Sequence, residues 1–226
     1  MGSFQPAADR LDLRAGNPPL WRNLVMAGKS IAFLFDFGSP NAYLVHRVIP
    51  QIESRHPVVF DYVPVLLGGI FKATNNQSPA TAFAHIPAKL AYDRLEIDRF
   101  CARHGIADYR MNPHFPVNTL TLMRGAIAAQ HLGLFAPYVE AVFCAMWRDG
   151  LKMDDPEVFA RALDAAGLPA GEIAARSQAP EVKGGLIANT DRAVARGAFG
   201  APTFFVDDAI YFGKDRLDEA VRAALA

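Results

Sequence analysis

Residues 31–43 of this chain read Ile31-Ala32-Phe33-Leu34-Phe35-Asp36-Phe37-Gly38-Ser39-Pro40-Asn41-Ala42-Tyr43. The near-continuous apolar run at the start predicts a strand that is covered on both faces. Ser39 and Pro40 predict a helix start, because a serine hydroxyl caps free N–H groups and proline suits the first helical turn. A second apolar strand is expected over residues 58–65. The stretch 31–65 therefore predicts a right-handed, parallel βαβ unit.

Helical periodicity dominates the middle of the chain, and strands return near its end. Helices are expected over residues 87–103, 118–131, 135–148, 155–166 and 180–196. Residues 203–206 and 209–212 predict a hairpin across Asp207-Asp208, and residues 214–226 a closing helix. The order βαβ, helical block, ββα predicts an α/β protein with a thioredoxin fold and an inserted all-helical domain.

The same order predicts how the chain divides into domains. Residues 1–29 hold a breaker cluster and no sustained period, so they are expected to form a loosely held, disordered N-terminal arm. Residues 30–76 and 197–226 are expected to form the thioredoxin-like domain. Residues 77–196 would then be the inserted helical domain.

Composition excludes several classes of protein. The chain has 226 residues, of which 51% are hydrophobic and 20% charged, and this excludes a disordered or low-complexity protein. The 23 basic residues balance the 23 acidic ones, which argues against partners such as nucleic acid or an anionic membrane. No apolar run approaches the ~20 residues of a membrane helix, and no signal-peptide pattern is present, so a cytoplasmic protein is expected.

Cysteine and histidine spacing excludes two further kinds of site. The two cysteines, Cys101 and Cys144, form no CxxC motif and are expected to be buried and inert. Phe143, Met146 and Trp147 lie at helical spacing and are expected in the core. The six histidines form no HxH, HxxxH or HExxH pair, so no metal site is predicted.

In a thioredoxin topology, the start of the first helix is the place that stabilises an anion. This chain reads Ser39-Pro40-Asn41-Ala42 where a redox enzyme carries Cys-x-x-Cys, so it cannot exchange disulfides there by itself. Ser39 is either a plain helix cap or a hydrogen-bond donor to the thiolate of a bound thiol. Pro202, placed before the strand at 203–206, is expected to form a cis-proline loop facing this helix start.

Four segments carry a resemblance to a known family: Asp36–Tyr43, Leu67–Lys72, Phe199–Thr203 and Phe212–Arg216. In this order they resemble the 2-hydroxychromene-2-carboxylate isomerases and the kappa-class glutathione transferases, in the DsbA-like branch of the thioredoxin superfamily. The resemblance runs from about Ile31 to the C-terminus. It implies a glutathione-dependent enzyme and a homodimer.

The resemblance also implies roles for individual residues. Ser39 would hydrogen-bond the glutathione sulfur, and the backbone of Ala201 before Pro202 would pair with the cysteinyl part. The other implied contacts to glutathione are Asn76 and Lys89 at the glycyl end, and Phe212, Gly213, Lys214 and Asp215 around the γ-glutamyl end. Lys72 matches a lysine of the isomerase substrate pocket. Phe115 and Asn118, in a loop before a helix, are candidates to line the pocket for the aromatic substrate.

The implied reaction interconverts 2-hydroxychromene-2-carboxylate and trans-o-hydroxybenzylidenepyruvate, in aromatic hydrocarbon catabolism. Reversible addition of the glutathione thiolate would turn the C=C bond into a single bond that rotates. Two alternatives stay open. One is a kappa-type transferase, in which the thiolate attacks an electrophile irreversibly, and the other is a non-catalytic binding module of thioredoxin fold.

Overall fold

The computed structural model describes residues 30–226, and the predicted N-terminal arm lies outside the described residues. The strands β1 (Ser30–Phe35), β2 (Val59–Pro64), β3 (Thr203–Val206) and β4 (Ala209–Phe212) form one sheet in the order β2-β1-β3-β4. β1 and β2 run parallel, whereas β3 runs antiparallel to both β1 and β4. The predicted βαβ unit and hairpin are therefore confirmed.

Ten α-helices and a short 3-10 helix accompany the sheet in the described residues. They are α1 (Pro40–Arg55), α2 (Leu67–Thr74), α3 (Pro79–Ala82), α4 (Pro87–His104), α5 (Leu120–His131), α6 (Phe135–Trp147), α7 (Pro156–Ala165), α8 (Ala170–Arg176), α9 (Pro180–Ala195), η2 (Lys214–Arg216) and α10 (Leu217–Leu225). The five helices expected in the middle of the chain correspond to α4, α5, α6, α7 and α9.

Three short helices and one helix start differ from expectation. The sequence does not predict α2, α3 or α8, because α3 and α8 are too short to show a period and α2 opens with Leu67-Gly68-Gly69. The closing α-helix begins at Leu217 and not at Lys214, since residues 214–216 form the 3-10 turn η2.

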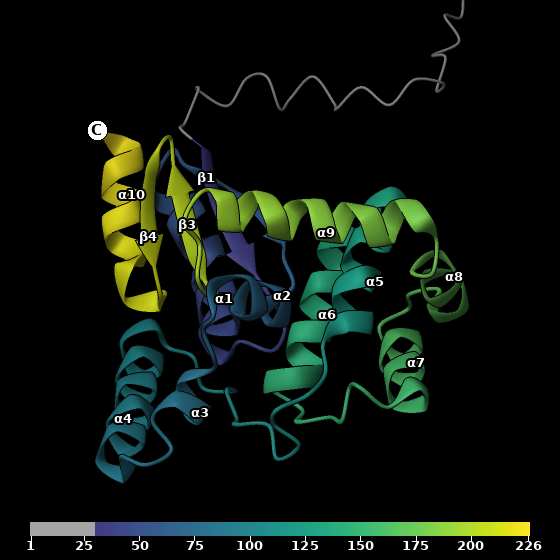
Figure 1. Ribbon diagram of the computed structural model, residues 1–226, viewed down its shortest axis with the longest axis horizontal. Coiled ribbons are helices and arrows are strands. Elements are labelled where there is room, and N and C mark those ends of the chain that lie inside the picture. The colour runs from purple at the N-terminus through teal and green to yellow at the C-terminus, as the bar shows by residue number, and fades with distance from the viewer. Residues whose placement is uncertain (1–29) are drawn as a thin grey trace, which may run out of the picture.

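The sheet separates two apolar layers. Phe33, Phe35 and Phe204 belong to the larger core, which includes residues of α1, α10 and the α5–α8 group. Leu34 and Phe205 point to the other face, where α2 and α9 pack. Figure 1 shows α9 running along the molecule beside the sheet, with α3 and α4 at one end and α5–α8 at the other. The junction of β1 and α1 thus lies between the helical block and the C-terminal strands.

The expected core residues of α6 are confirmed, and one cysteine differs. Phe143, Met146 and Trp147 are fully buried, and the Trp147 indole N–H donates to the Phe37 carbonyl at 2.8 Å. Cys144 is buried as expected, but Cys101 on α4 is only half-buried. Among helices of the described part of the chain, none has both the length and the apolarity to span a bilayer.

Candidate active site

Ser39 sits at the N-terminus of α1 and faces the chain before β3. Its hydroxyl oxygen accepts a hydrogen bond from the Ala42 amide at 3.2 Å, so the predicted helix cap is confirmed. The same hydroxyl donates to the Ala201 carbonyl oxygen at 2.9 Å. Only 4% of Ser39 is exposed. The serine therefore connects the start of α1 to the loop before β3, at the positive end of the α1 dipole.

The loop before β3 carries the predicted cis-proline. The Ala201–Pro202 peptide bond is cis. The Pro202 carbonyl accepts from the Gly213 amide at 2.9 Å, which fixes the end of β4 beside this loop. Ala201, Pro202 and Gly213 are thereby brought into one cluster with Ser39.

An aromatic pair covers one side of the same loop. The rings of Phe199 and Phe212 lie 4.4 Å apart between centroids, and both residues are exposed by about two fifths (43% and 42%). A Cβ atom on Gly200 would come within 2.8 Å of the Phe212 ring, so only glycine allows the ring to lie there. The Asn76 side-chain amide donates to the Phe199 carbonyl at 2.9 Å and joins the end of α2 to the loop. Asn76 and Phe212 therefore belong to the cluster.

Lys214 is buried, which is unusual for a lysine. Its side chain is only 4% exposed, and the ammonium lies 5.3 Å from the Phe100 ring centroid on α4. Asp215, exposed at the surface, accepts from the ammonium at 2.6 Å. A buried ammonium requires a charged partner and a polarisable neighbour, and Lys214 has both in Asp215 and Phe100. The contact of Lys214 with Phe100 joins η2 to α4, directly after Gly213 of the cluster.

The other two candidate lysines lie on helices at the border of the cluster. Lys89 on α4 forms an ion pair with Asp93, one turn further along, and its ammonium lies 5.3 Å from the Phe83 ring centroid. Lys72 is exposed on α2. Within residues 30–226, no hydrogen bond or ion pair joins either lysine to the Ser39 cluster, whose hydrogen bonds run through Ala201, Gly213 and Asn76.

Phe115 and Asn118 occupy the loop before α5 and each has a partner within the protein. The Phe115 ring lies 6.0 Å from Trp147 between centroids and is half-buried. The Asn118 side-chain oxygen accepts from the Leu120 amide at 3.1 Å, close to the helix start. This loop approaches the Ser39 loop, since Trp147 binds the Phe37 carbonyl.

Asp36 is a functional candidate that the sequence reasoning missed. Its carboxylate is fully buried and accepts from the Gly38 amide at 2.8 Å and the Leu67 amide at 2.7 Å. Burial raises the pKa of Asp36, while these amides and the Thr119 hydroxyl act in the opposite direction. The signal in the sequence was an acidic residue inside the apolar run of residues 31–37, directly after the end of β1. Asp36 holds the Ser39 loop against the starts of α2 and α5.

Asn41, two residues after Ser39, carries an unpaired polar atom. Within residues 30–226, no donor bonds to its buried side-chain oxygen. Buried acceptors are normally satisfied, so an unpaired one in the first turn of α1 is available to a donor from outside the chain. In the part of the chain that the structure describes, no group of three His, Cys, Asp or Glu side chains is placed to hold a metal.

The sequence and the fold, with its helix cap, cis-proline and mixed four-stranded sheet, are similar to those of known proteins. The family described as the DSBA-like thioredoxin domain matches residues 30–224. The chain belongs to the DSBA-like thioredoxin family. Within this family it lacks the paired cysteines at the start of α1, where it carries Ser39 and Ala42.

Relatives of this DSBA-like chain include two kinds of enzyme. It is 28% identical over 192 residues to a 2-hydroxychromene-2-carboxylate isomerase of Sphingobium xenophagum, covering 84% of this chain and 95% of that protein. It is 25% identical over 200 residues to glutathione S-transferase kappa 1 of Caenorhabditis elegans, covering 82% and 86%. The resemblance inferred from the four sequence segments is therefore confirmed.

A solved structure supports the fold. The structure of a 2-hydroxychromene-2-carboxylate isomerase superposes with a TM-score of 0.74 at 24% identity, covering 86% of this chain and 93% of that one. The predicted thioredoxin fold with a helical insertion is thus confirmed.

Proposed function

We propose that this DSBA-like protein is a glutathione-dependent isomerase that interconverts 2-hydroxychromene-2-carboxylate and trans-o-hydroxybenzylidenepyruvate. The observation that supports it most is the hydrogen bond from the Ser39 hydroxyl to the Ala201 carbonyl, at the start of α1. It presents one donor and one acceptor side by side, next to a helix N-terminus and without a protein thiol. The relatives named as isomerases support the choice of reaction.

The donor and acceptor fit the central residue of glutathione. A cysteinyl unit carries an N–H that suits the Ala201 carbonyl and a sulfur that suits the Ser39 hydroxyl. Both protein groups satisfy one another at 2.9 Å in this structure, so neither is left unpaired before binding. When bound, glutathione would supply the nucleophilic sulfur that converts the C=C bond reversibly into a rotatable single bond.

Ser39 would then act by turning its hydroxyl from Ala201 to the sulfur. A free thiol has a pKa near ~8.5, so only a small fraction is ionised at neutral pH. One charge-assisted hydrogen bond and the α1 dipole together can stabilise the thiolate by about 1.4 kcal/mol, which corresponds to one pKa unit. Ser39 is the residue to which we assign the catalytic role.

The remaining assignments follow the placement of the side chains. We assign Ala201, Pro202, Phe212, Gly213 and Asn76 to the glutathione contact, because hydrogen bonds and ring contacts link them to Ser39. Asp215 keeps an exposed carboxylate that suits an ammonium, while the buried Lys214 holds η2 against α4. Lys89 at the glycyl end rests on the resemblance alone.

The substrate side of the site is assigned to the loop before α5 and to α2. We assign Phe115 and Asn118 to the aromatic body of the substrate, and Lys72 to its carboxylate or developing enolate. The free acceptor of Asn41 adds a partner for a hydroxyl or amide donor of either ligand. We also propose a homodimer, and a division into residues 30–76 with 197–226 and residues 77–196, which sedimentation and limited proteolysis of the full chain test.

The experiment is an isomerisation assay with the free thiol measured in parallel. The full chain is incubated with trans-o-hydroxybenzylidenepyruvate, in the presence and in the absence of a small amount of glutathione. We expect turnover that requires glutathione and leaves the free thiol concentration constant. Ser39→Ala should lower the rate at least tenfold, while Ser54→Ala, near the far end of α1, should not.

Other outcomes separate the alternatives. Stoichiometric loss of thiol, with an electrophile as co-substrate, identifies a kappa-type transferase. No glutathione binding and no turnover identifies a non-catalytic binding module. Turnover that is equal with and without glutathione contradicts the proposed function.

A further inference from the structure

A cavity of about 340 Å³ lies between the sheet and α9, on the face of the sheet opposite α1. We call it the α9 cavity. Its apolar floor comes from three adjacent strands, with Ala32 and Leu34 of β1, Val63 of β2 and Phe205 of β3. The register pairs Ala32 with Phe205 and Leu34 with Val63, so these side chains form one continuous surface. Sites for small molecules usually have volumes of about 300–1,000 Å³.

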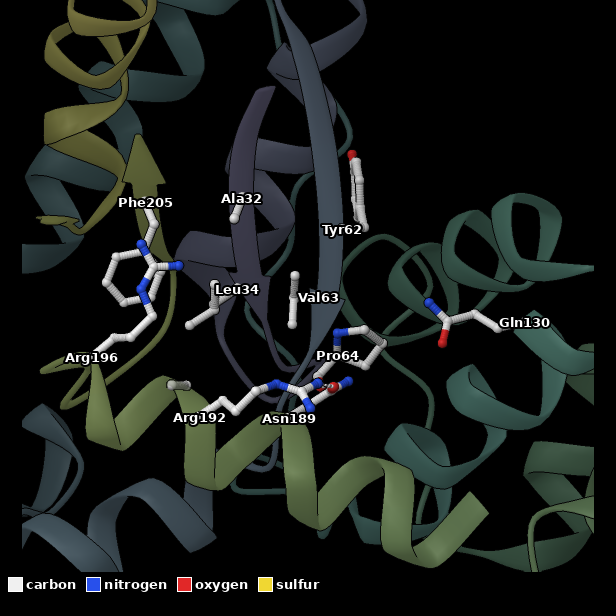
Figure 2. A pocket seen from close by; sticks show the side chains of 11 residues that line it. Ala32, Leu34, Tyr62, Val63, Pro64, Gln130, Asn189, Arg192, Arg196 and Phe205 are labelled. Atoms are coloured by element: carbon white, nitrogen blue, oxygen red, sulfur yellow. Dashed lines mark hydrogen bonds between the residues drawn. The ribbon is translucent and has the colours of Figure 1, made fainter. Parts of the chain in front are cut away.

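The hollow has a simple origin in residue size. Ala32 occupies the centre of the floor, and Ala193 of α9 lines the same cavity. Two methyl side chains cannot fill the distance between a sheet and a helix, which leucine-sized residues normally fill. Figure 2 shows the resulting gap, with Leu34 and Val63 on the strands and Arg192 and Asn189 rising from α9.

Two guanidinium groups border the cavity. Arg196 lies over the Phe205 ring, 3.9 Å from its centroid, and donates to the Asp207 backbone carbonyl at 2.6 Å. Arg192, one turn earlier on α9, donates to the Asn189 side-chain oxygen. Both acceptors are uncharged, and neither guanidinium forms an ion pair with a carboxylate in residues 30–226. Hydrogen bonds therefore hold both arginines in place, while no carboxylate of residues 30–226 neutralises their charge.

We infer that the α9 cavity binds a small carboxylate with a flat apolar body. Like charges four residues apart on a helix repel, and an anion between Arg192 and Arg196 removes this repulsion. A planar carboxylate matches the fork of a guanidinium and forms two hydrogen bonds with it. The apolar body would lie against Ala32 and Val63, the partly exposed residues of the floor, and release water from them. Because Ser39 lies on the α1 side of the sheet, this site is separate from the proposed active site.

The test is a calorimetric titration of the full chain with 1-naphthoate, with 1-naphthalenemethanol as the uncharged matched probe. We expect one naphthoate to bind in the α9 cavity of each chain, at least tenfold more tightly than the alcohol binds there. Arg192→Gln and Arg196→Gln should each weaken naphthoate about tenfold and leave the alcohol unchanged. Ala32→Leu should remove this binding of both probes, because leucine fills the floor.

Two further variants distinguish binding in the α9 cavity from binding at the Ser39 cluster or at an exposed arginine. Ser39→Ala and Arg222→Gln, a change at an exposed arginine on α10, should leave the affinity for naphthoate unchanged. Thermal unfolding checks that each variant is folded. Because Arg196 packs on Phe205, Arg192→Gln and Ala32→Leu decide the question if Arg196→Gln unfolds. No binding by the wild type, binding that survives both Arg192→Gln and Ala32→Leu, or binding that disappears in Ser39→Ala overturns the inference.

Discussion

Two side chains at the junction of β1 and α1, Ser39 and Asp36, have different roles. Ser39 presents its hydroxyl, and Asp36 holds the loop that places it. The sequence predicted Ser39 because a serine before a proline at a helix start is a local pattern. It did not predict the role of Asp36, because two of the partners, Leu67 and Thr119, come close only through folding.

Asp36→Asn should destabilise the protein by about 1–3 kcal/mol. An asparagine offers one oxygen and one NH₂ group, so the amide of Gly38 or that of Leu67 loses its buried acceptor. Urea unfolding followed by circular dichroism measures the change. Asp164→Asn, at an exposed carboxylate on α7, is the control and should change stability by less than about 0.5 kcal/mol. Equal effects of the two substitutions would contradict the role of Asp36.

Hydrogen bonds between polar side chains link α1 to α6. The His46 ring on α1 bonds both Tyr62, at 2.8 Å, and Glu140 on α6, at 2.9 Å. Arg47 donates to the same carboxylate at 3.2 Å. These bonds, with the hydrogen bond of His46 as the largest cause, lower the pKa of Glu140 to about 2. No local pattern in the sequence reveals this link, because its members lie on separate elements.

The lowered pKa predicts a stability that depends on pH. In the unfolded chain the carboxyl titrates near ~4.3, so the stabilisation by Glu140 is complete above that pH and is lost as the pH falls toward 2. Since half of the side chain is exposed, we expect only about 1 kcal/mol. Urea unfolding of wild type and Glu140→Gln should differ by that amount at pH 7 and converge at or below pH 2. A difference that is independent of pH would contradict this prediction.

The contact between α5 and α6 depends on one glycine. A Cβ atom on Gly125 would lie 2.0 Å from the Tyr138 hydroxyl oxygen, which donates to the Leu122 carbonyl at 2.8 Å. Gly125→Ala should therefore destabilise the protein by about 3 kcal/mol through overpacking and loss of this bond. Gly184→Ala on α9, where a Cβ meets open space, is the matched control and should stabilise by about 0.5–1 kcal/mol. Thermal unfolding compares the two, and similar values would contradict the importance of this close contact.

The whole molecule shows which features a single sequence can reveal. The order of strands and long helices was predictable, because each has a period or an apolar run of its own. The helices α2 and α8 were not, since α2 owes its start to the Asp36 carboxylate and α8 has seven residues. The burial of Lys214 depends on Phe100, more than a hundred residues away, and no local pattern encodes it.

The proposed function requires that the chain contributes no sulfur of its own. Burial raises the pKa of Cys101, and burial followed by the Glu140 carboxylate raises the pKa of Cys144 to about 12. The double variant Cys101→Ser and Cys144→Ser should keep at least half of the glutathione-dependent isomerase rate, provided that it folds. Loss of activity in a folded double variant, measured in the isomerisation assay, would show that a protein thiol takes part.

The most direct test is the pKa of the glutathione thiol on the protein, obtained from thiolate absorbance against pH. With the wild type, the thiol pKa should fall about one unit or more below the value of ~8.5 for a free thiol. In Ser39→Ala most of this shift should disappear, while Ser54→Ala should keep it. An equally low pKa in Ser39→Ala, or an unshifted pKa in the wild type, would contradict the assignment of Ser39 as the group that stabilises the thiolate.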